Sequence, residues 1–114
     1  MKKGFHWILE GEASKLCVMY RTLVFGADGR VGGRLAAYLE EYGLEVVKCG
    51  RGFCDLKDLS ALKRVLLSSG ATHVVNCAAV SGLEACLDDP ETAHRVNAMA
   101  PEMMARICRL EGMR

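Results

Sequence analysis

Short apolar runs alternate with amphipathic stretches along the chain from about residue 20. Runs at 21–25, 44–49 and 73–79 predict buried parallel strands. Helical spacing of apolar residues predicts a helix over 30–42, and the list of its expected buried face is Val31, Leu35, Tyr38, Leu39 and Tyr42. A second helix carries Leu59, Leu62, Val65 and Leu66 and closes at 68–70. Strands alternating with helices in this order predict an α/β fold with a parallel sheet and right-handed crossovers.

The sequence Asp89-Pro90-Glu91 is a strong helix start, because it combines an N-cap acid, proline at the first helical position and a second acid in the first turn. Pro101 either kinks this helix or begins another. The apolar residues expected on the far side of Pro101 are Met103, Met104, Ile107 and Leu110.

The length of 114 residues suits one domain, and fifteen basic against fourteen acidic residues give a formal net charge of +1. A net charge this small gives no strong positive electrostatic field to attract a polyanion, so nucleic acid is not an expected partner. No run approaches the ~18 apolar residues of a membrane span, so no membrane is expected either. Residues 1–18 do not share the alternating pattern. We expect an N-terminal extension at 1–18, not native if Met19 is the true start, and a domain at 19–114.

The six cysteines fit packing better than crosslinking. Several lie inside apolar runs, where a free thiol behaves as a small hydrophobe, and the expected core is not poor enough to need disulfides. There is no Cys-x-x-Cys, and His6, His73 and His94 stand apart from the cysteines, so no metal site is expected. Reduced cysteines indicate the cytoplasm.

The turn between the first strand and the first helix is rich in glycine and reads Gly-Ala-Asp-Gly-Arg-Val-Gly over 26–32. Glycines at this spacing allow a tight turn, close approach of the backbone to a pyrophosphate and close helix–strand packing. The helix start adds unpaired N–H groups and the positive end of the helix dipole. The turn therefore predicts dinucleotide binding, although an ordinary strand–helix turn can also use glycines.

The end of the second strand bears on which dinucleotide binds. In the NAD form an acid usually stands there and bonds the ribose 2′-hydroxyl, but this strand ends in Lys48-Cys49-Gly50-Arg51. A guanidinium could grip a 2′-phosphate in bidentate fashion. Arg51, helped by Lys48 or Arg30, therefore favours NADP(H) over NAD(H), unless Arg51 is simply a solvated turn residue.

The glycine-rich turn and three later stretches together resemble the extended short-chain dehydrogenase/reductases, most closely the dTDP-4-dehydrorhamnose reductase branch. The three later stretches are Cys54-Asp55-Leu56, the Asn-Cys-Ala-Ala-Val segment at 76–80 and the Pro-Glu helix that carries Val96-Asn97-Ala98. The resemblance covers about 21–114 and implies a Rossmann-type doubly wound parallel sheet, cut after about four strands. The short stretch at 53–56 would contain the step that follows the third strand. The domain at 19–114 would then be a partial NAD(P)-binding domain.

The resemblance also implies which residues touch the cofactor. The pyrophosphate would lie on Gly26, Gly29, Arg30, Val31 and Gly32, with Asp28 in the same turn; the adenine on Asp55 and Leu56; and the nicotinamide-side ribose along Ala78, Ala79 and Val80. Asp55 could instead cap a helix, and the two alanines could be plain packing. Asn97 is expected to hold backbone groups rather than to act in catalysis. Val80-Ser81 stands where these reductases usually carry His-Thr, which weakens any assignment of the sugar.

The family's catalytic Tyr-x-x-x-Lys pair is absent from this sequence, since Tyr20, Tyr38 and Tyr42 are followed four positions later by Val24, Tyr42 and Val46. No catalytic residue is therefore assigned. One hypothesis is the cofactor-binding portion of a sugar-nucleotide reductase, inactive alone, which would take its substrate only with a further C-terminal part. The alternatives are a non-catalytic dinucleotide-binding or regulatory relative and a fragment of another NAD-dependent sugar epimerase or dehydratase. An unpaired strand edge would give marginal stability or association, for instance as a homodimer.

Overall fold

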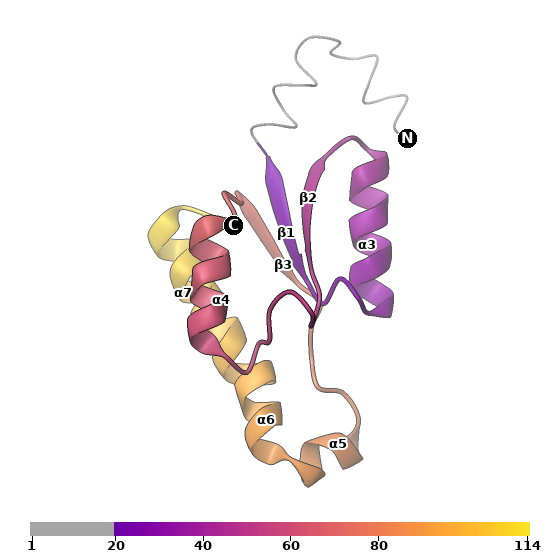
Figure 1. The fold of residues 1–114 in the computed structure, drawn as a ribbon, viewed down its shortest axis with the longest axis vertical. Coiled ribbons are helices and arrows are strands. Elements are labelled where there is room, and N and C mark those ends of the chain that lie inside the picture. The colour runs from indigo at the N-terminus through magenta and orange to yellow at the C-terminus, as the bar shows by residue number, and fades with distance from the viewer. Residues whose placement is uncertain (1–19) are drawn as a thin grey trace.

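A computed structural model describes residues 20–114 (Figure 1). The elements follow in the order β1 (Arg21–Phe25), α3 (Arg30–Glu41), β2 (Glu45–Cys49), α4 (Leu59–Ser68), β3 (His73–Asn76), α5 (Leu83–Asp88), α6 (Pro90–His94), a π-helical segment (Arg95–Met99) and α7 (Ala100–Glu111). The expected start at Met19, the extension at 1–18 and Cys17 lie outside the described residues. The alternation of strands and helices confirms the predicted α/β class.

The strands form a parallel sheet in the order β2-β1-β3, with Thr22 of β1 opposite Val46 on one side and His73 on the other. The chain steps from β1 to β2 and then crosses back over β1 to β3. Such a reversal is a topological switch point, where open α/β sheets bind ligands. At the far edge of β3, Arg114 makes two ladder-type bonds, from its N–H to Thr72 O at 2.9 Å and from Val74 N–H to its own carbonyl at 2.7 Å.

The expected strand count of about four is wrong for the described residues, which hold three strands. The short stretch at 53–56 is instead a turn, because the N–H groups of Phe53 and Cys54 both donate to Gly50 O at 3.0 and 3.1 Å. Cys54 and Leu56 are buried while Phe53 is exposed. The apolar residues here cover the core without pairing to a strand.

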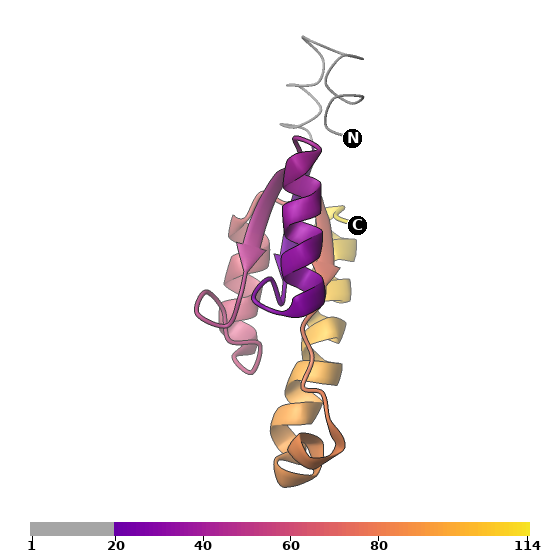
Figure 2. The same cartoon turned by 90° about the vertical axis from the view of Figure 1, so that its right-hand side faces the viewer.

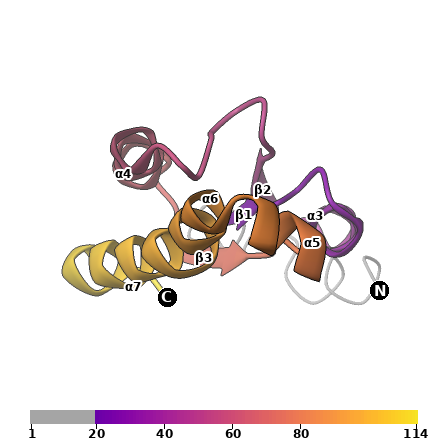
Figure 3. The same ribbon diagram turned by 90° about the horizontal axis from the view of Figure 1, so that it is seen from below.

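Helices cover both faces of the sheet, as a doubly wound fold requires. Seen along the strands, α3 lies on one side, and α4 and α7 lie on the other (Figure 3). Leu23 and Phe25 of β1 belong to the core that α4 and α7 share, and Val24 between them points to the opposite face, toward α3. The buried residues that α4 and α7 contribute are Leu62, Leu66, Ala100, Met104 and Ile107.

The expected buried face of α3 is partly wrong. Its fully buried residues are Gly32 and Ala36, whereas Val31 is 70% and Tyr38 54% exposed. Small residues face the sheet because the helix lies very close to the backbone of β1 and its turn. A pattern drawn from large apolar side chains therefore misplaces the buried stripe.

Residues 90–111 form one long helical run, which Figure 2 shows projecting past the ends of the strands. Asp89 caps α6 as expected, its carboxylate accepting from Thr92 N–H at 3.1 Å. Pro101 lies in the first turn of α7 and causes no break, because the run passes through a π-helical segment just before it. Leu110 is exposed, and α5 has no counterpart in the sequence prediction. None of the helices described here combines the length and apolarity that a bilayer crossing needs.

Replacing Asp58 with alanine is expected to lower the free energy of unfolding by about 1 kcal/mol. Asp58 is the N-cap of α4, and its Oδ1 accepts from the N–H groups of Ser60 and Ala61, both at 3.1 Å. Urea titration followed by circular dichroism measures the change. Asp58→Asn keeps the accepting oxygen and is expected to stay near wild type; an equal loss in both variants would contradict a capping role.

Candidate functional site: a pocket at the carboxyl ends of the strands

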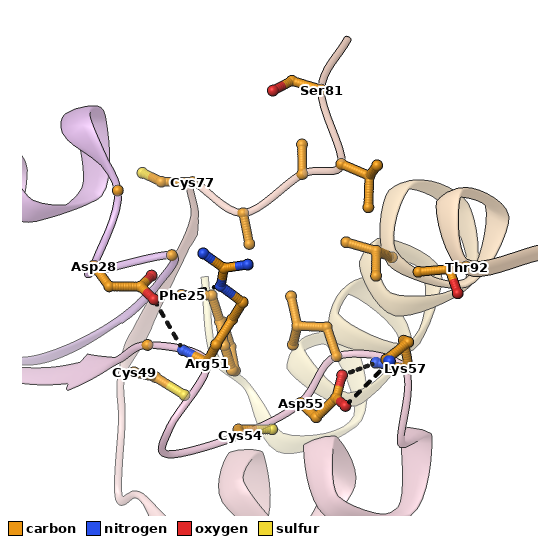
Figure 4. A pocket seen from close by; sticks show the side chains of 18 residues that line it. Phe25, Asp28, Cys49, Arg51, Cys54, Asp55, Lys57, Cys77, Ser81 and Thr92 are labelled. Carbon is orange, nitrogen blue, oxygen red and sulfur yellow. Dashed lines mark hydrogen bonds and ion pairs between the residues drawn. The ribbon is translucent and has the colours of Figure 1, made fainter. Parts of the chain in front are cut away.

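A pocket of about 580 Å³ opens where the three strands end (Figure 4). Its walls come from the segments that follow each strand, namely the turns after β1 and β2 and the segment after β3. The first turn of α6 and the π-helical segment close one side through Thr92 and Val96. The pocket thus occupies the switch point at which the fold predicts a ligand.

The glycines of the first turn are required by close backbone packing. Gly26 has φ +74°, and a Cβ there would lie 2.7 Å from the backbone of Cys77 and Ala78. A Cβ on Gly32 would overlap the carbonyl oxygen of Gly26 and lie 2.7 Å from its carbon. The N–H groups of Gly26 and Ala27 donate to Cys49 O at 3.0 and 3.3 Å, which ties the turn to the end of β2.

The start of α3 is suited to an anion. Gly29 is the N-cap and supplies no side-chain acceptor, and the first turn holds no acidic residue. The first N–H groups of a helix carry partial positive charge and have no partner within the helix. Backbone donors without a side chain over them are what a pyrophosphate needs for close approach.

Two oppositely charged side chains meet where the turns after β1 and β2 face each other. Asp28 Oδ2 accepts from Arg51 N–H at 3.3 Å and lies 3.6 Å from Arg51 Nε, as Figure 4 shows. The hydrogen bond from the Arg51 backbone, more than its charge, holds the pKa of Asp28 below its ordinary value. The Arg51 side chain is 95% exposed and remains available to a ligand.

Asp55 and Leu56 line the pocket on the side away from Asp28. The Asp55 carboxylate accepts from Lys57 N–H at 3.0 Å and lies 3.7 Å from Lys57 Nζ. The alternative that Asp55 caps a helix is wrong, since Asp58 is the N-cap of α4.

The segment after β3 is held by side-chain amides. Asn97 pairs with both backbone groups of Val80, accepting from its N–H at 2.8 Å and donating to its carbonyl at 2.9 Å. Asn76 Oδ1 accepts from Ala78 N–H at 3.1 Å. Asn97 therefore holds backbone groups between strand and helix, as expected from the sequence, and the π-helical segment that carries it aims its side chain there.

Nine of the twelve residues expected at the cofactor line this pocket: Gly26, Asp28, Gly29, Arg51, Asp55, Leu56, Ala78, Ala79 and Val80. Arg30, Val31 and Gly32, which form the first turn of α3, are not among the lining residues. Lys48, which we expected to help Arg51 bind a 2′-phosphate, instead pairs with Glu40, its Nζ lying 3.3 Å from Glu40 Oε1.

The other lining residues, which the sequence patterns do not predict, are Phe25, Cys49, Gly50, Cys54, Lys57, Cys77, Ser81, Thr92 and Val96. Most of them directly flank predicted positions, and their place at strand ends could have indicated them. Thr92 and Val96 had no such signal, because only the packing of the long helical run brings them to the pocket.

Cysteines form part of the pocket floor. Cys49 and Cys54 are buried in the core, and the cysteines of the described part of the chain are free thiols, as expected. Burial raises the pKa of Cys49 to about 12 and raises that of Cys54 as well. Neutral, buried thiols suit packing rather than nucleophilic or metal chemistry. Within residues 20–114, no three His, Cys, Asp or Glu side chains gather as a metal site would require.

The chain matches the family model described as RmlD substrate binding domain over residues 20–114. A dTDP-4-dehydrorhamnose reductase of Streptomyces griseus is 35% identical over 92 residues, which cover 81% of this chain and 30% of that protein. A crystal structure of a hypothetical dTDP-4-dehydrorhamnose reductase from Sulfolobus tokodaii aligns with a TM-score of 0.75 at 27% identity, over 82% of this chain and 36% of that one. The UDP-glucose 4-epimerase of Thermus thermophilus, solved with NAD, aligns with a TM-score of 0.72 at 27% identity, over 82% and 35%. The chain thus spans about a third of the length of these relatives, and it belongs to the RmlD substrate binding domain family, as its four motifs indicated.

Proposed function

We propose that residues 20–114 form the dinucleotide-binding part of a reductase of 4-keto-6-deoxy sugar nucleotides, with NADP(H) favoured over NAD(H). The observation that carries this proposal is the pocket at the switch point. There the start of α3, which no side chain caps, leaves its first N–H groups for a pyrophosphate, and the absence of side chains at Gly26 and Gly29 gives that group room to approach.

The described residues fit such a cofactor along the whole pocket. The glycine turn would hold the pyrophosphate, Asp55 and Leu56 the adenine, and Ala78 to Val80 the ribose on the nicotinamide side. The last segment is rigid because Asn97 fixes Val80. Arg51 supports the preference for NADP(H), because its exposed guanidinium stands at the end of β2, where a 2′-phosphate would arrive.

Relatives named dTDP-4-dehydrorhamnose reductase support reduction of the sugar as the proposed reaction. A reduced nicotinamide supplies a hydride, which would pass to the C4 carbonyl of the sugar. This sequence holds no Tyr-x-x-x-Lys pair to protonate the carbonyl oxygen. We therefore propose that this chain alone binds the cofactor without reducing the sugar nucleotide.

Titration of the full chain with NADPH, followed by the fluorescence of the reduced nicotinamide, tests the proposal. We expect saturable binding and no turnover when the sugar nucleotide is added. In Arg51→Gln the affinity for NADPH should fall about tenfold while that for NADH changes less than about twofold, since only NADPH carries the 2′-phosphate. Arg109→Gln, an exposed arginine on α7, is the matched control. Absence of binding by the wild-type chain would overturn the proposed function, and an equal loss for both cofactors would overturn the role of Arg51.

A further inference from the structure

We propose that Asp28 is a specificity-determining residue, which places at the end of β2 the carboxylate that this strand lacks and so limits the preference for NADP(H). This inference rests on the proposed function, because it assigns a role within the same dinucleotide pocket.

Asp28 lies against the end of β2. Although it belongs to the turn after β1, its carboxyl carbon lies 3.1 Å from where a Cβ of Gly50 would be, and its Oδ2 accepts from Arg51 N–H at 3.3 Å. Gly50 and Arg51 directly follow β2. The carboxylate therefore occupies the space that an acidic residue at the end of the second strand fills in NAD-binding folds. The missing side chain of Gly50 makes the room.

The charge of Asp28 acts on the same end of the pocket as Arg51. The hydrogen bond from the Arg51 backbone lowers the pKa of Asp28 and so favours the charged carboxylate, whose side chain is 47% exposed on the pocket wall. A carboxylate here can accept a hydrogen bond from a ribose 2′-hydroxyl but repels a 2′-phosphate. Arg51 acts in the opposite sense from the same end of the pocket.

The other charged residues that line the pocket do not take over the roles of Asp28 and Arg51. Asp55 and Lys57 lie in the segment that leads to α4 and are 3.7 Å from each other, so their charges largely cancel (Figure 4). Arg51 attracts the 2′-phosphate of NADP(H) and Asp28 repels it. The wild-type chain therefore has only a weak preference for NADP(H) over NAD(H), and the charge of Asp28 determines how weak it is.

Asp28→Asn in the full chain tests the inference. The amide keeps an oxygen for Arg51 N–H and removes the charge. By isothermal titration calorimetry we expect NADP⁺ to bind about tenfold more tightly than to wild type, while NAD⁺ changes less than about twofold. The gain should shrink at high ionic strength because salt screens the repulsion. Asp88→Asn, which removes the same charge at the end of α5 outside the pocket, should leave both affinities unchanged. Asp28→Ser provides a second neutral variant should the amide disturb folding.

A merely structural Asp28, needed only to join the two turns, would weaken NADP⁺ and NAD⁺ binding equally; that outcome, or an unchanged ratio, overturns the inference. Binding of neither cofactor to the wild-type chain would overturn the proposed function as well, so the two failures are distinguishable.

Discussion

Alanine at position 32 is expected to lower the free energy of unfolding by about 3 kcal/mol and to abolish dinucleotide binding. Its Cβ would overlap the carbonyl oxygen of Gly26, and both partners are backbone, so no side chain can rotate away. The helix must then move off the turn. Because α3 begins at that turn, its first N–H groups would leave the position that the proposed pyrophosphate needs.

Urea unfolding followed by circular dichroism measures the stability change in Gly32→Ala, and NADPH titration measures binding. Gly52→Ala is the matched control, because a Cβ at Gly52 meets nothing within 4 Å and Gly52 has no positive φ. We expect that control to stay within about 0.5 kcal/mol of wild type. Near-wild-type stability in Gly32→Ala would contradict the close packing of α3 on the turn.

Truncation of Phe25 to alanine is expected to cost about 4 kcal/mol of unfolding free energy. Phe25 is 1% exposed at the end of β1 and packs in the core that α4 and α7 share. Its removal leaves a cavity at the point where the sheet, both helices and the floor of the pocket meet.

Phe53→Ala provides the control for Phe25→Ala, since Phe53 is 62% exposed and its loss should change stability by less than about 0.5 kcal/mol. The midpoints of urea unfolding give both values. A Phe25→Ala variant that is already unfolded without urea agrees with the prediction. Similar midpoints for the two variants would show that Phe25 is not part of the core.

Local patterns predicted the strands well and the face of α3 poorly. A strand is recognised from residues that are adjacent in the sequence. The apolar run at 21–25 therefore predicts a strand with the same bounds as the observed β1. The expected strand at 73–79 is longer than the observed β3, which ends at Asn76 because Asn76 and Asn97 bind the backbone beyond it. Helical spacing predicts Tyr38 on the buried face, but the buried residues of that helix are the small ones, Gly32 and Ala36.

Some features of the candidate site can also be predicted from local sequence, and others cannot. The glycines of the turn after β1 can be recognised in the sequence, because a positive φ or close packing of the backbone within the turn requires them. The pairing of Asp28 with Arg51 joins residues 23 positions apart and could not be predicted from either alone. Thr92 and Val96 reach the pocket through the packing of the long helical run.

The order of strands and helices, the glycine turn and the family follow from the residues alone, because hydrophobic period, helix caps and turn chemistry are short-range properties of the chain. The buried face of α3, the turn at 53–56 and the carboxylate of Asp28 at the end of β2 required the packed molecule. Each of these depends on which distant backbone or side chain fills the adjacent space, and close packing settles that for all elements together.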